Sequence, residues 1–314
     1  MNGINGQLFR GDNLDILRQH VADKSVDLVY LDPPFKSDRN YSHISPQRSE
    51  SRSRKRTPAF DDTWRWDAGA DEFYDDASRT SEKVFRVLHA MRQLVGESDL
   101  LAYLVMMAPR LEELRRVMRS TATIYLHCDP SASHYLKLLM DAVFGIENMR
   151  NEIVWCYRGG GVPRRDFARK HDIILRYSKT DDYYFDVDAV RVPYSDDVLQ
   201  SSPSRYDKSY RDNKVYEGYR PNPSGKHPDD WWPMQAILPS SNERLGYPTQ
   251  KPKALLQRIV QASTREGEVV LDPFCGSGTT LVVAEELGRT WLGIDVSDLA
   301  IDITEGRLAT SNDG

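Results

Sequence analysis

The segment GEVVLDPFCGSGTT, residues 267–280, joins a short apolar run to a glycine-rich turn. An apolar run of this length is typical of a strand buried on both faces of a parallel sheet. Gly276 and Gly278 follow it, and an apolar helix is expected over 281–287, so the backbone can approach a ligand closely at a helix N-terminus. A second apolar run ends near Asp295, where a carboxylate accepts hydrogen bonds from the hydroxyls of an adenosine ribose. This order of elements predicts a site for an adenosine-containing cofactor.

The same turn departs from the GxGxxG pattern of a dinucleotide site. Leu281 stands at the position of the third glycine, and Asp272 before the turn would repel a pyrophosphate. Both residues favour a cofactor with a cationic or zwitterionic tail over NAD, and they argue against a dehydrogenase. A tight strand-to-helix turn that carries a solvated aspartate is the purely structural alternative.

Similar apolar runs alternate with amphipathic patterns along the whole chain. Strands are expected at 26–31, 121–129, 151–157, 171–178 and 290–296, and helices at 99–118, 131–144 and 252–263. Strands that alternate with helices are typical of a doubly wound α/β sheet, so the predicted fold class is α/β.

The predicted strand at 26–31 closes on Asp32-Pro33-Pro34-Phe35. The two prolines remove backbone donors and fix φ, so the Pro33 carbonyl faces outward without a competing amide. Asp32 adds a second acceptor and Phe35 adds a flat ring. Two acceptors beside a stacking face suit a planar exocyclic amine, whereas a structural turn is the alternative.

Composition excludes several classes of protein. The 314 residues carry a net charge of −5, 39% are hydrophobic, and the mean hydropathy is −0.59. No apolar run reaches the length of a membrane span, and the first residues show no secretory signal pattern. Three cysteines far apart predict neither a disulfide scaffold nor a metal site. We therefore expect a cytoplasmic protein without a metal or a membrane partner.

Two polar stretches interrupt the α/β pattern. The first, 36–67, contains a basic run and is interpreted as a mobile loop; the second is interpreted as an insert at 181–245. The remaining residues, 1–180 and 246–314, form the predicted catalytic and cofactor-binding domain. Residues 158–226 hold 14 Lys+Arg and 11 Asp+Glu, so this region carries 14 − 11 = +3 although the chain carries −5. Tyrosines interleave with basic residues there, which suits contacts with nucleic acid or a plain solvated face.

Five ordered motifs resemble those of the beta class of amino-methylating DNA methyltransferases, which act on N6 of adenine or N4 of cytosine. They are RGDNLDIL (10–17), DPPF (32–35), GYPTQKP (246–252), DPFCGSGTT (272–280) and WLGIDV (291–296). The catalytic motif precedes the cofactor motif, which is the circularly permuted order of that class. The resemblance implies a Rossmann-like, seven-stranded methyltransferase sheet with an inserted target-recognition region, in which the N-terminus supplies the strand next to the second cofactor strand.

The resemblance also implies S-adenosylmethionine as cofactor and assigns roles to the matching residues. Those expected near the cofactor are Asp12 and Asn13 at its adenine, Asp295 at its ribose, Thr249 and Lys251 at its carboxylate, and Asp272, Phe274, Gly276, Gly278 and Thr279 in the loop along its methionine and ribose. A solvated lysine is the alternative for Lys251. The insert is expected to bind double-stranded DNA through Arg205, Lys208, Arg211, Lys214 and Arg220.

In this interpretation the target base is flipped out of the duplex and stacks on Phe35. Hydrogen bonds to Asp32 and to the Pro33 carbonyl stabilise the charge that develops on the exocyclic nitrogen during direct attack on the methyl group. Cys275 is expected to be small filler in the cofactor loop, and His127 and His134 are expected in core or surface roles.

The catalytic motif Asp-Pro-Pro-Phe is typical of adenine-N6 methylation within the family. Cytosine-N4 methylation is the alternative, and an RNA or protein amine methyltransferase is a further one. A homodimer and a cognate restriction endonuclease are open as partners.

Overall fold

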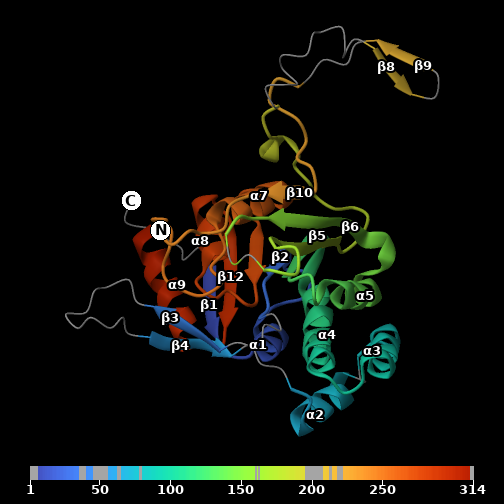
Figure 1. The fold of residues 1–314 in the computed structure, drawn as a ribbon, viewed down its shortest axis with the longest axis vertical. Coiled ribbons are helices and arrows are strands. Elements are labelled where there is room, and N and C mark those ends of the chain that lie inside the picture. The colour runs from blue at the N-terminus through green and yellow to red at the C-terminus, as the bar shows by residue number, and fades with distance from the viewer. Residues whose placement is uncertain are drawn as a thin grey trace.

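The computed structural model describes residues 6–34, 40–44, 56–61, 65–77, 80–159, 161, 163–194, 208–211, 214–217 and 222–311. Its centre is an eight-stranded sheet (Figure 1) with the order β1 (Gly6–Arg10), β12 (Thr290–Asp295), β11 (Val269–Asp272), β2 (Val26–Leu31), β5 (Met118–Cys128), β7 (His171–Ser178), β6 (Met149–Cys156) and β10 (Trp231–Pro233). β1 pairs in parallel with β12, so the first and last strands of the chain lie side by side. The permuted order predicted from the motifs is therefore confirmed.

Helices cover both faces of the sheet. They are α1 (Asn13–His20), α2 (Ala68–Ala77), α3 (Glu82–Val95), α4 (Asp99–Val117), α5 (Ser133–Phe144), α7 (Lys253–Ser263), α8 (Thr279–Glu286) and α9 (Asp298–Ser311). Side chains alternate between the two faces of a strand, and β2 shows this directly. Its Val29 and Leu31 pack into a core with α1, α3, α4 and α5, whereas Leu28 and Tyr30 pack into a second core with α7 and α8. None of the described helices is long and apolar enough to cross a membrane.

The predicted elements are present, with three differences in detail. β7 runs antiparallel to both β5 and β6, although its apolar run read like a parallel strand. An apolar run reports burial on both faces, which β7 shares with its parallel neighbours, and it carries no information on direction.

The second difference is an eighth strand, where the resemblance implied seven. β10 pairs in parallel with β6, with Trp232 beside Trp155, so part of the range 181–245 belongs to the main sheet. A strand of three residues is too short for any periodic pattern, which is why the sequence did not reveal it.

The third difference lies in the polar stretches. Within the stretch predicted as a mobile loop, β3 (Asn40–Ile44) and β4 (Arg56–Asp61) pair as an antiparallel hairpin. β8 (Lys208–Arg211) and β9 (Lys214–Glu217) form a second hairpin in the insert.

Candidate active site

A cavity of about 530 Å³ opens at the carboxyl edge of the sheet. Four neighbouring parallel strands, β1, β12, β11 and β2, each reach this edge with an aspartate at or just beyond the last residue, and these are Asp12, Asp295, Asp272 and Asp32. All four line the cavity. Between β11 and β2 the order of strands along the chain changes direction, and ligands of open α/β sheets bind at such a switch point.

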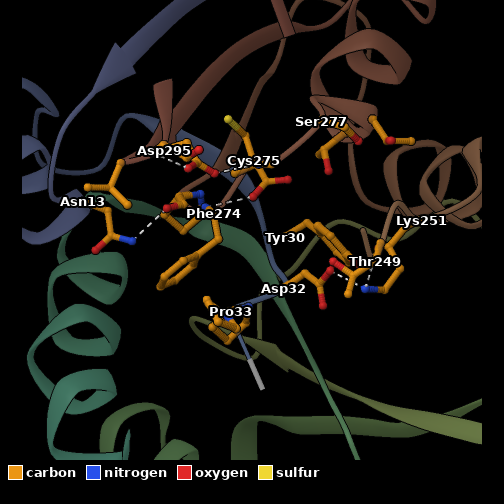
Figure 2. A pocket seen from close by; sticks show the side chains of 18 of the residues that line it. Asn13, Tyr30, Asp32, Pro33, Thr249, Lys251, Phe274, Cys275, Ser277 and Asp295 are labelled. Atoms are coloured by element: carbon orange, nitrogen blue, oxygen red, sulfur yellow. Dashed lines mark hydrogen bonds and ion pairs between the residues drawn. The ribbon is translucent and has the colours of Figure 1, made fainter. Parts of the chain in front are cut away.

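The structure brings most of the predicted site residues into this cavity (Figure 2). Its lining includes Asp12, Asn13, Asp32, Pro33, Pro34, Thr249, Lys251, Asp272, Phe274, Gly276, Thr279 and Asp295. Gly278 is not among the lining residues. Phe35 lies outside the described residues, so its predicted stacking role stays a prediction.

Lys251 is the residue whose contacts differ most from the expectation. It was expected at the carboxylate of the cofactor or in solvent. In the structure its ammonium donates to Oδ2 of Asp32, and both side chains are largely buried (Figure 2). The ion pair occupies only one carboxylate oxygen, because no hydrogen bond within the described part of the chain uses Oδ1 of Asp32. Asp32 therefore keeps one acceptor for a ligand.

Asp295 is held by the backbone of the glycine turn. Its Oδ2 accepts from Gly276 N at 2.8 Å, and its Oδ1 accepts from Ser297 N at 2.9 Å. Burial raises the pKa of this carboxyl, and the backbone donors oppose that shift. The carboxylate is thus fixed in orientation at the cavity wall.

Asp272 lies between Asp295 and Asp32, because β11 lies between β12 and β2 in the sheet. Burial raises its pKa to about 7, hydrogen bonds from Thr280 and from Phe274 N lower it, and the charges of Asp32 and Asp295 raise it further. No lysine or arginine of the described chain forms an ion pair with Asp272. A cationic ligand group would complete this part of the cavity.

Arg110 was not predicted from the sequence. It binds Asp12 and Asn13 at the end of the cavity that lies away from Asp32. From α4 it donates to Asp12 at 2.6 Å and to Oδ1 of Asn13 at 2.6 Å, and Asn13 in turn donates to Pro273 O at 2.8 Å. These contacts connect α1 to the turn that follows β11, although the two are far apart in sequence. The sequence signal that could have revealed this residue is a single arginine within the apolar stripe of α4, between Met107 and Leu111.

A buried polar chain connects β2 with β7. The Tyr30 hydroxyl lies 2.9 Å from Nδ1 of His127, and Nε2 of His127 lies 3.2 Å from Asp172, which also accepts from the Tyr157 hydroxyl at 3.0 Å. Burial tends to raise the pKa of Asp172, but His127, Lys251 and Tyr157 together outweigh burial, and the pKa is lowered. His127 therefore links the Asp172 carboxylate to the Tyr30 hydroxyl. His127 is fully buried, which agrees with the core alternative of the two roles expected for it.

Gly278 has a structural role at the start of α8. Its φ is +73°, and a Cβ there would lie 2.6 Å from the buried side chain of Thr304. We expect Gly278→Ala to lower the free energy of unfolding by about 1–3 kcal/mol, because the added methyl group combines backbone strain with a clash.

Gly306→Ala is the matched control, since Gly306 lies inside α9 and a Cβ there meets nothing within 4 Å. This variant should be neutral or slightly stabilised, because alanine is the better helix former. Urea unfolding of both variants checks the pair. Equal stability of the two would show that Thr304 gives way without cost.

The residues predicted to bind DNA fall outside what the structure describes. Arg205 and Arg220 are not among the described residues, and neither are the side chains of Lys208, Arg211 and Lys214. Their role stays a prediction.

The permuted sheet, with its cavity at the switch point, defines the class: this is the fold of S-adenosylmethionine-dependent methyltransferases. PvuII DNA methyltransferase, described as cytosine-N4-specific, superposes with a TM-score of 0.60 at 13% identity and covers 98% of this chain and 90% of its own. TTHA0409 from Thermus thermophilus, solved in complex with S-adenosyl-L-methionine, superposes with a TM-score of 0.53 at 17% identity and covers 98% and 94%. At these identities the likeness concerns the fold alone.

Sequence comparison identifies the family. Residues 26–306 match the N6/N4 methyltransferase family model, described as DNA methylase, and the chain belongs to this family. Type II methyltransferase M.HpaI of Haemophilus parainfluenzae is 31% identical over 205 residues, which are 65% of this chain and 59% of M.HpaI. DNA adenine methyltransferase YhdJ of Escherichia coli (strain K12) is 25% identical over 307 residues, 96% of this chain and 82% of YhdJ. For M.HpaI, M.BglII and M.ScaI the matched part is between 50% and 59% of the relative's length.

Proposed function

We propose that this chain is a site-specific DNA methyltransferase that moves a methyl group from S-adenosylmethionine to N6 of a flipped-out adenine in double-stranded DNA. The observation that carries the proposal is the position of Asp32. Asp32 keeps one unused acceptor and lines the same cavity as the glycine turn and Asp295, so a proposed amine acceptor site and a proposed adenosine site adjoin each other.

The residues of the cavity fit this cofactor. Its volume lies within the range of small-molecule sites. Asp295 offers two fixed carboxylate oxygens to the ribose hydroxyls. Asp272 offers to the sulfonium region a buried carboxyl that has no cationic partner among the described residues. Asp12 and Asn13, held by Arg110, face the adenine end. When bound, S-adenosylmethionine supplies an electrophilic methyl group.

The catalytic edge of the cavity fits an exocyclic amine. Asp32 accepts one amine hydrogen through Oδ1, and the Pro33 carbonyl accepts the other, because Pro34 has no N–H to compete for it. Both acceptors stabilise positive charge that develops on the nitrogen. Lys251 holds Asp32 in place through Oδ2, and the chain from Tyr30 to Asp172 fixes the end of β2 beneath it.

Adenine is the proposed base on two grounds. The motif Asp-Pro-Pro-Phe is typical of adenine methylation, and YhdJ, whose match spans most of both chains, is named a DNA adenine methyltransferase. The range 181–245, apart from the sheet strand β10, is proposed as the target-recognition region. A homodimer and a cognate endonuclease stay predictions.

Incubation with methyl-labelled S-adenosylmethionine and methylation-free DNA, followed by digestion to nucleosides, tests the proposal. Label in N6-methyladenine is the expected result. Label in N4-methylcytosine would support the proposed mechanism but would show that the methylated base is cytosine and not adenine. If no DNA carries label while RNA or protein does, the substrate class is wrong.

The shifted carboxyl of Asp272 predicts a pH dependence of cofactor binding. With a pKa near 7, Asp272 is largely neutral at pH 6 and ionised at pH 8. A sulfonium favours the ionised form, so binding of S-adenosylmethionine releases a proton at pH 6, and its affinity rises with pH. We expect the Kd to tighten by about 10-fold from pH 6 to pH 8, measured by calorimetry.

S-adenosylhomocysteine provides the matched control, because it lacks only the methyl group and its positive charge. Its Kd should change little over the same range, and Asp272→Asn should flatten the profile for S-adenosylmethionine. Parallel pH profiles for the two ligands would contradict the proposed pairing of Asp272 with the sulfonium.

A further inference from the structure

The loop 158–170, which joins β6 to β7, rises from the same sheet edge as the cavity. Cys156 pairs with His171 at its base, and β7 continues beside the carboxyl end of β5, where Ile173 pairs with Cys128. β2 and β6 are separated by β5 and β7. Three strand spacings of about 4.8 Å place the loop base roughly 14 Å from the end of β2.

Backbone contacts anchor the base of this loop. Tyr157 N donates to Lys170 O at 3.0 Å, and the Lys170 ammonium donates to the carbonyls of Gly159 and Gly161. Gln235, beyond β10, donates to Arg158 O at 2.8 Å. The loop is thus held at its base, and its tip extends into solvent.

Phe167 at the tip is 99% exposed. Among the described large apolar side chains the next most exposed is Leu94, at 76%. Burying a phenylalanine side chain contributes about 1.5–3 kcal/mol relative to leaving it in water. A ring this exposed at the tip of an anchored loop is available to pack against a ligand.

The charge of the loop indicates what that ligand is. Residues 158–170 contain five basic residues and one acid, Asp166, so the loop carries 5 − 1 = +4. Arg164, Arg165 and Arg169 are exposed, and none of them forms an ion pair with another described residue. Cationic side chains around an aromatic ring match a partner with phosphates outside and stacked bases inside.

We propose that Phe167 enters the DNA base stack and fills the space that the flipped base leaves, while Arg164, Arg165 and Arg169 contact the flanking phosphates. This inference rests on the proposed function. A base that reaches Asp32 must leave the duplex, and unstacking costs free energy that an inserted apolar side chain recovers.

The test uses a short duplex that carries the modification site, located by sequencing DNA methylated by the wild-type protein. Phe167→Ala is expected to lower kcat/KM on this duplex about 10-fold, because stacking on the ring is lost. Phe167→Trp should stay near wild type, since it restores an aromatic face. Leu94→Ala, an exposed apolar site on α3, is the matched control and should have no effect.

A second duplex, with an abasic site opposite the target base, separates insertion from simple binding. Flipping is easier in this duplex because the target base has no pairing partner. Phe167→Ala should therefore lose little activity on it. Equal losses on the two duplexes, or no loss on the paired one, would overturn the insertion of Phe167.

The arginines are tested by salt dependence of binding to the same duplex. Each of Arg164→Ala, Arg165→Ala and Arg169→Ala should reduce the slope of log K against log salt by about 0.9. Arg86→Ala, an exposed arginine on α3 that pairs with Glu82, should leave the slope unchanged. Unchanged slopes in all three loop variants would overturn the phosphate contacts.

Wild-type protein that labels no DNA would overturn the proposed function itself, whereas active wild type with unaffected loop variants would overturn this inference alone.

Discussion

Replacement of Asp32 by alanine is expected to lower kcat for methyl transfer by about 10³-fold, because a preorganised acceptor at the reacting nitrogen is lost. The Kd for S-adenosylmethionine should stay within a few-fold of wild type, since Asp32 lies at the amine side of the cavity. Single-turnover transfer of labelled methyl groups and calorimetric titration with the cofactor measure the two quantities separately.

Asp32→Asn is the control for the charge. Its side-chain oxygen can still accept one hydrogen, so the loss should be smaller than in Asp32→Ala, although Lys251 then lacks an anionic partner. Thermal unfolding of both variants shows whether the unpaired Lys251 destabilises the fold. Transfer at the wild-type rate in folded Asp32→Ala would remove Asp32 from the mechanism.

The elements that position the site were predictable because each is a local pattern. The run at 26–31 and the run at 171–178 match β2 and β7 residue for residue, and the helix at 99–118 matches α4 within one residue. Continuous apolar runs bounded by polar residues report burial directly. The order of the motifs predicted that β1 and β12 are neighbouring strands.

The contacts between distant segments were not predictable in the same way. Arg110 and Asp12 are 98 residues apart, and Lys251 and Asp32 are 219 residues apart. No periodicity or spacing links such pairs, because they meet only through the order of strands in the sheet. The direction of β7 and the pairing of β10 depend on the same tertiary packing.

These long-range contacts explain how one cavity combines four aspartates. Arg110 neutralises Asp12 and Lys251 neutralises Asp32, so the two outer carboxylates of the row have cationic partners. The inner pair, Asp295 and Asp272, depends on backbone and hydroxyl donors and on what binds in the cavity. Burial raises the pKa of both inner carboxyls, because no described cation pairs with either. This is the electrostatic reason to expect hydroxyl donors at Asp295 and a cation at Asp272.

Replacement of Asp295 by alanine is expected to weaken S-adenosylmethionine binding by about 10²- to 10⁴-fold. Hydrogen bonds to a charged group contribute about 1.5–3 kcal/mol each, and two ribose hydroxyls would donate to this carboxylate. Asp295→Asn keeps one acceptor, so its Kd for S-adenosylmethionine should lie between those of Asp295→Ala and wild type. Both Kd values come from calorimetry on protein whose thermal unfolding shows an intact fold.

A double-mutant cycle with a 2′-deoxy analogue of the cofactor separates the ribose contact from the support that Asp295 gives to Gly276 and Ser297. Wild type should lose affinity for the analogue, and Asp295→Ala should bind the analogue and the parent cofactor almost equally. If the analogue costs the same affinity in both proteins, Asp295 does not contact the 2′-hydroxyl. Its contribution would then come from the 3′-hydroxyl or from the conformation of the glycine turn, because Gly276 and Ser297 lose their common acceptor in Asp295→Ala.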